Sequence, residues 1–127
     1  MTTESSFLVY VVDDDEAVLD STLLLLEAEG IAAAGYRTPQ EFLAGFEPAR
    51  ASCLLLDVHM PLLSGIELLG QLRERGVVTP AIMMTGRSDD GIEEVARRRD
   101  AALLAKPPND DELISLVRAA SRRPRAV

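Results

Sequence analysis

Short apolar runs alternate along the chain with longer segments in which apolar positions recur every three or four residues. The apolar runs occupy residues 7–12, 31–36, 53–56, 81–85 and 101–105. Runs this short and this apolar are typical of parallel strands that are covered on both faces. The run at 31–36 is the weakest of these strand predictions because Gly35 interrupts it.

The intervening segments have helical periodicity. Their predicted bounds are 16–29, 39–46, 64–75, 89–99 and 110–122. Thr38 suits a helix N-cap and Pro39 a first helical position, while Asn109 followed by Glu112 resembles a capping box. Strand and helix patterns alternate throughout. This order predicts an α/β fold, a doubly wound parallel sheet with five strands and five helices.

Polar side chains stand where the predicted strands end. They are Asp13 and Asp14 after the first strand, Asp57 after the third, Thr85 at the end of the fourth and Lys106 after the fifth. Ligands of such sheets bind beyond the carboxyl ends of the strands, so we expect these side chains on one rim. Singly, each could be an ordinary turn, cap or surface residue. Their joint placement is what indicates a site.

The carboxylates of this rim repel one another, which favours a bound cation. Mg2+ takes one or two carboxylates, keeps several waters and bridges to phosphate oxygens, so it suits Asp13, Asp14 and Asp57. The next two acidic residues, Asp15 and Glu16, have a separate explanation. They open the first predicted helix, where negative side chains complement the helix dipole.

Composition bounds the remaining possibilities. A chain of 127 residues, 47% hydrophobic and 27% charged, is expected to form one soluble domain. The net charge of -8 argues against direct nucleic acid binding. No apolar run is long enough to span a membrane, the N-terminus does not resemble a signal peptide, and Cys53 has no disulfide partner. We therefore expect a cytoplasmic protein without a membrane partner.

Four motifs carry a family resemblance: "VVDDDEAV", "LLLDVHMPLLSG", "MMTGR" and "AKPP". With them the chain resembles the receiver domain of bacterial two-component response regulators, most closely the nitrogen-fixation-regulator subgroup. The resemblance covers about residues 7–120 and implies a flavodoxin-like sheet with strand order 2-1-3-4-5. Residues 1–127 would then be a single receiver domain. The basic tail at 121–127 would be a solvated end or the start of a linker.

The resemblance implies how the rim works. Asp57 would be the phosphoacceptor, taking a phosphoryl group from a sensor histidine kinase or a phosphotransfer protein. Lys106 would pair with the phosphoryl group, Thr85 would hydrogen-bond to it, and the Lys106–Pro107 peptide would be cis. Mg2+ would be held by Asp13, Asp14, Asp57 and the backbone carbonyl of His59.

Three further positions lie near the predicted rim. In the family, the places of His59 and Arg87 tune the lifetime of the phosphoryl group, although His59 could equally be a plain rim residue. An imidazole ligand is not expected, because Mg2+ prefers oxygen. Gly65 is expected to supply unusual backbone dihedrals after the Met-Pro turn.

The chain also departs from the family pattern. Arg99 and Asp100 stand where receivers usually carry Gly-Ala, Leu103 stands for an aromatic residue, and Pro108 for phenylalanine. We therefore expect phosphorylation to be read through the helix at 89–99. A pseudo-receiver, folded but used only for binding, is the main alternative.

Two other questions stay open at this level. A hydrolase of the haloacid dehalogenase type, using Asp13 and Asp15, would leave Asp57 unexplained. The run of four leucines at 23–26 cannot all face the sheet. It would pack against the last helix or form a self-association face, which allows a homodimer.

Overall fold

The structure is a computed structural model that describes residues 8–87 and 89–122. Phe7 and the part of the basic tail beyond Arg122 lie outside these residues. The described chain forms one parallel sheet in the order β2-β1-β3-β4-β5, which confirms the predicted fold. The strands are β1 (Leu8–Val12), β2 (Ala33–Tyr36), β3 (Ala51–Asp57), β4 (Ala81–Thr85) and β5 (Ala101–Ala105).

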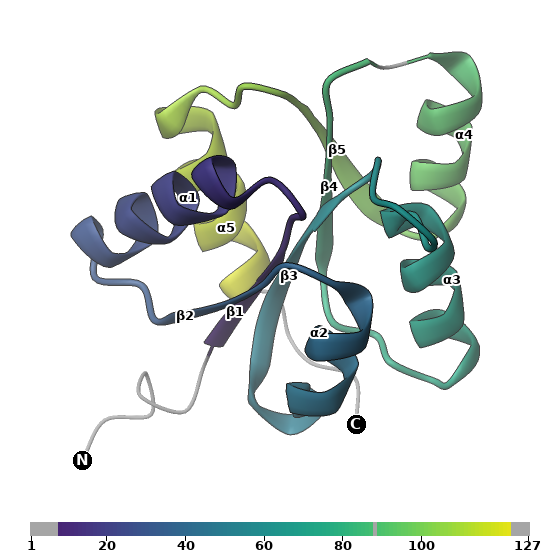
Figure 1. Ribbon diagram of the computed structural model, residues 1–127, viewed down its shortest axis with the longest axis horizontal. Coiled ribbons are helices and arrows are strands. Elements are labelled where there is room, and N and C mark those ends of the chain that lie inside the picture. The colour runs from purple at the N-terminus through teal and green to yellow at the C-terminus, as the bar shows by residue number, and fades with distance from the viewer. Residues whose placement is uncertain (1–7, 88, 123–127) are drawn as a thin grey trace.

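The helices cover both faces of this sheet (Figure 1). Helices α1 and α5 lie on one face, and α2, α3 and α4 lie on the other. Their bounds are α1 (Glu16–Ala28), α2 (Pro39–Gly45), α3 (Gly65–Glu74), α4 (Asp90–Arg98) and α5 (Asp110–Ser121). Each agrees with the prediction to within a residue at either end. A short 3-10 helix at Pro48–Arg50 was not predicted.

Side chains fix where the helices begin. The Thr38 hydroxyl accepts a hydrogen bond from the Glu41 amide, as the N-cap prediction required. Asn109 likewise accepts from the Glu112 amide. The full reciprocal capping box lies elsewhere, at the start of α3, where Ser64 and Glu67 exchange side-chain and backbone bonds.

Alternate residues of the central strands belong to two apolar layers, one on each face of the sheet. Leu54 and Leu56 of β3 point toward α2, α3 and α4, whereas Cys53 and Leu55 point toward α1 and α5. All four side chains are buried. Because both faces are covered, the central strands are apolar throughout, which explains the sequence pattern.

The glycine of β2 lets α1 lie close to the sheet. A β-carbon on Gly35 would sit 2.7 Å from a Leu23 methyl carbon and 2.9 Å from one of Leu19. Of the leucine run, Leu26 is fully buried, and Leu23 and Leu25 pack against the layer that includes α5. Packing therefore accounts for most of the run. Only Leu24, 65% exposed, faces outward among the four.

No helix within residues 8–87 and 89–122 is long and apolar enough to cross a membrane.

Candidate functional site

Three carboxylates meet at the carboxyl ends of β1 and β3. Asp13 is fully buried, Asp57 is buried and Asp14 is half-buried. One oxygen from each lies within 4.8 Å of the others. Strand order places these ends side by side, because β1 pairs with β3 over residues 9–12. The predicted acidic cluster is therefore present.

Lys106 supplies the positive charge nearest to this cluster. Its ammonium lies 3.0 Å from Asp13 Oδ2 and 3.3 Å from Asp57 Oδ1. Burial alone would lower the pKa of Lys106, but the two carboxylates outweigh burial and hold the pKa above its ordinary value. The lysine is thus a cation directed into the site. One ammonium still leaves three carboxylates incompletely neutralised.

Asp57 is the carboxylate that resists ionisation. Burial, and then the charge of Asp13, raise its pKa from 3.8 to about 6, although Lys106 opposes the shift. Its Oδ1 accepts a hydrogen bond from the His59 amide at 3.3 Å and faces Lys106. Within the described residues its other oxygen, Oδ2, makes no hydrogen bond.

The donor set suits a hard divalent cation. Asp13 Oδ1 accepts from the Asp15 amide at 2.9 Å. Among the described residues, the buried Asp13 Oδ2 contacts the Lys106 ammonium at 3.0 Å as an ion pair and has no hydrogen-bond partner. An oxygen-only cluster with an under-coordinated buried oxygen fits the coordination that Mg2+ prefers.

The loop between β3 and α3 lies against Asp57. The Gly65 amide donates to the Val58 carbonyl at 3.1 Å. A β-carbon on Gly65 would sit only 2.3 Å from the Asp57 carbonyl oxygen. The prediction that Gly65 supplies unusual dihedrals is wrong, because the positive φ of this loop, 72°, belongs to Leu62. Glycine is required at position 65 for close approach of two backbone segments.

Thr85 ends β4 with its hydroxyl fully engaged. The hydroxyl lies 2.7 Å from the Arg87 carbonyl oxygen and accepts from the Arg87 amide at 3.1 Å. The Nε2 atom of His59 lies 3.1 Å from the same hydroxyl. This imidazole contact was not predicted. No sequence signal identifies it beyond the place of His59 two residues after Asp57.

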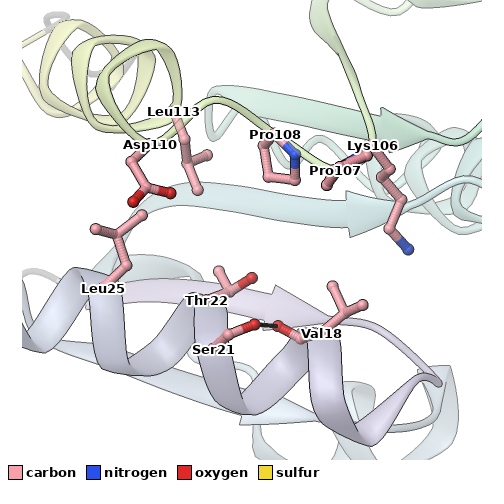
Figure 2. Close-up of a pocket in the computed structure, with 9 residues that line it drawn as sticks. All are labelled: Val18, Ser21, Thr22, Leu25, Lys106, Pro107, Pro108, Asp110 and Leu113. Carbon is pink, nitrogen blue, oxygen red and sulfur yellow. Dashed lines mark hydrogen bonds between the residues drawn. The ribbon is translucent and has the colours of Figure 1, made fainter.

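An apolar groove adjoins the site on the side of α1. Its volume is about 430 Å³. Figure 2 shows Leu25 of α1 and Leu113 of α5 on facing sides, with Lys106 at one end. The groove is lined by Val18, Ser21, Thr22, Leu25, Lys106, Pro107, Pro108, Asp110 and Leu113. The Lys106–Pro107 peptide is cis, as predicted.

The structure therefore brings the acidic residues and Lys106 into one cluster. His59 connects Thr85 to this cluster, because its amide donates to Asp57 and its ring contacts the Thr85 hydroxyl. The chemical roles of these residues, and the His59 carbonyl as a ligand, stay predictions.

Known proteins resemble this chain in sequence. Residues 9–118 match the family described as the response regulator receiver domain. The transcriptional regulatory protein FixJ of Azorhizobium caulinodans is 40% identical over 116 residues, which is 91% of this chain and 55% of that protein. The response regulator protein TodT of Pseudomonas putida is 33% identical, over 88% of this chain and 50% of TodT. The chain thus spans about half the length of these curated relatives.

Solved structures agree with the fold. The crystal structure of FixJ-N superposes with a TM-score of 0.84 at 31% identity and covers 95% of this chain and 98% of that one. The BeF3-activated DrrB receiver domain superposes with a TM-score of 0.81 at 27% identity, covering 92% and 98%. With its acidic cluster and lysine, the chain belongs to the receiver domains of two-component response regulators, which are signalling proteins.

Proposed function

We propose that the protein accepts a phosphoryl group on Asp57 from a phosphohistidine of a sensor kinase or phosphotransfer protein. The observation that carries this proposal is the geometry of the buried Asp57 carboxylate. Its Oδ1 lies 3.3 Å from the Lys106 ammonium, and its Oδ2 makes no hydrogen bond within the described residues. Phosphoryl transfer depends on positioning and on neutralising the transferred charge, and both are provided here.

The transfer follows from the geometry. Asp57 Oδ2 forms a bond to phosphorus as the phosphorus–nitrogen bond of the donor breaks, and the donor imidazole leaves with the bonding electron pair. The His59 amide holds Oδ1, so the carboxylate keeps its orientation during attack. Lys106 pairs with the phosphoryl oxygens as they arrive.

Mg2+ is the cofactor that best suits the cluster. Asp13, Asp14 and Asp57 would hold it, with the carbonyl oxygen of His59 as a further ligand. When bound, it supplies positive charge to the phosphoryl oxygens. The buried Asp13 Oδ2 supports this assignment, because its contact in the described part of the chain is the Lys106 ion pair, without a hydrogen bond.

The donor protein would lie along the groove between α1 and α5. This groove is largely apolar and ends at Lys106, so a partner seated in it reaches the rim. Phosphorylation would then change association with a partner or with a second copy of the chain. With a net charge of -8, the chain is not expected to bind nucleic acid itself.

One experiment tests the acceptor. Incubation with acetyl phosphate and Mg2+ should add one phosphoryl group by intact-mass measurement, and Asp57→Asn should remain unlabelled. Equal labelling of the variant would overturn the assignment. A wild-type protein that never labels, and does not bind beryllofluoride, would instead be a pseudo-receiver.

The hydrolase alternative is disfavoured by one observation. The Asp15 carboxylate caps α1, accepting from the Ala17 amide at 3.0 Å and from the Val18 amide at 3.2 Å. It is exposed and committed to the helix, so it does not supply the second catalytic carboxylate beside Asp13 that such an enzyme needs.

A further inference from the structure

The hydroxyl of Thr85 makes as many hydrogen bonds as a hydroxyl can make. Its oxygen lies 2.7 Å from the Arg87 carbonyl oxygen, and two oxygens approach so closely only with a proton between them. The single proton of Thr85 therefore points at Arg87. The Arg87 amide and the His59 imidazole occupy the two acceptor positions of the hydroxyl, each at 3.1 Å.

This count of hydrogen bonds determines whether the His59 imidazole donates to the Thr85 hydroxyl or accepts from it. Because the hydroxyl proton is already used, the imidazole must donate, from Nε2–H, to the Thr85 oxygen. A phosphoryl group on Asp57 presents only acceptor oxygens. To bind one of them, Thr85 has to turn its proton away from the Arg87 carbonyl and lose the geometry in which it accepts from His59.

We propose that the His59 imidazole is a positioning residue that holds the Thr85 hydroxyl in its Arg87-bonded orientation and thereby opposes occupation of Asp57 by a phosphoryl group. This inference rests on the proposed function of Asp57. The inference gives the His59 side chain a role separate from the metal-ligand role proposed for its backbone carbonyl. The side chain acts only through the Thr85 hydroxyl.

The contact can break without disturbing the core. His59 is exposed, and it lines a cavity of about 370 Å³ together with Gly86 and Arg87, so the ring has room to turn. The same residue donates its amide to Asp57 Oδ1. His59 thus touches the acceptor through its backbone and Thr85 through its ring, which links the two groups directly.

A pair of variants matched in length isolates the donated hydrogen bond. His59→Gln keeps an N–H donor, whereas His59→Met keeps a chain of similar length without one. Beryllofluoride with Mg2+ serves as the probe, since it occupies Asp57 as a phosphoryl mimic and does not hydrolyse. Loss of one hydrogen bond should tighten beryllofluoride binding by His59→Met about three- to tenfold, with His59→Gln close to wild type.

A double-mutant cycle shows whether the effect passes through Thr85. In Thr85→Val, which lacks the hydroxyl, His59→Met should no longer alter beryllofluoride affinity. The Arg87 amide resonance, which reports the Thr85 hydroxyl, should shift in His59→Met and not in His59→Gln.

Other results would overturn the inference. These are unchanged or weaker beryllofluoride binding by His59→Met, or an undiminished effect in Thr85→Val. Failure of wild type to bind beryllofluoride at all would instead overturn the proposed function.

Discussion

Asp57 lies in surroundings that disfavour its charge, and this has a cost for the metal-free protein. Burial and the neighbouring Asp13 raise its pKa to about 6 in the folded state, against 3.8 for an unperturbed side chain. Between these values the folded protein holds a proton that the unfolded chain releases. Stability that protonated Asp57 contributes is therefore lost as pH rises from about 4 through 6.

Asp57→Asn should remove this pH dependence. In the presence of a chelator at pH 7, we expect the variant to be more stable than wild type by about 1–3 kcal/mol, because a neutral amide replaces a buried carboxylate. Below pH 4 the two proteins should converge. Urea unfolding across this pH range measures the difference, and a gap that widens in acid would contradict the explanation.

Asp14 contributes charge to the cluster, and within the described residues the ion pairs of Lys106 are with Asp13 and Asp57. Removing it as Asp14→Ala should relieve repulsion, so the metal-free protein should melt at the same or a higher temperature. Addition of Mg2+ should raise the melting temperature of wild type and have much less effect on the variant. Thermal melts with and without Mg2+ decide this. An equal response of the two proteins to Mg2+ would show that the metal binds elsewhere.

Most boundaries of the helices and strands could be predicted from the local sequence. The bounds of β4 and β5 match the prediction, because apolar runs between turn signals are read directly. The start of β3 at Ala51 was missed, because this residue becomes a strand only by pairing with Leu8 of β1. The need for Gly65 also depends on tertiary structure, since it comes from the approach of the Asp57 carbonyl. Neither the start of β3 nor the need for glycine at position 65 can be read from neighbouring residues in the sequence.

If the phosphoryl donor protein binds in the groove between α1 and α5, a substitution that fills the groove should slow phosphoryl transfer. Ser21 is exposed on α1 and lines the groove, and its hydroxyl donates to the Ala17 and Val18 carbonyls of its own helix. Ser21→Tyr should fill part of the groove and slow phosphoryl transfer from a kinase about tenfold or more, whereas labelling by acetyl phosphate should be unaffected.

Ser21→Ala is the matched control, because it leaves the groove open. Transfer rates from the phosphorylated kinase and from acetyl phosphate, measured side by side, separate docking from chemistry. A parallel loss of both rates would mean that the substitution disturbs Asp57 itself.

Over the whole molecule, burial is uneven. Strands β1, β3 and β4 form the buried centre, whereas Ala96 is the one buried residue described in α4, whose polar side chains are mostly exposed. Segments with little buried surface open most readily.

The fold and the acidic cluster were predictable because motifs and strand ends define them. The hydroxyl network of Thr85 was not, because it depends on side-chain orientations across two loops.

Binding of a phosphoryl group or of beryllofluoride at Asp57 should change the local stability of α4 more than that of other elements. Amide exchange with and without beryllofluoride should show its largest changes over residues 90–98. Leu103→Ala should keep most of this response, because Leu103 is only partly buried and has no ring to reorient. Loss of the whole response in Leu103→Ala would place the switch in β5 instead.

Arg73 ties down the end of α4 farthest from Asp57. Its guanidinium donates to the Arg99 carbonyl at 3.0 Å, just after α4, and to the Thr79 carbonyl at 2.7 Å, just before β4. The first turn of α4 follows the Thr85 loop directly. We therefore expect a displacement at Thr85 to shift the start of α4, while Arg73 holds the end of the helix against the loop before β4.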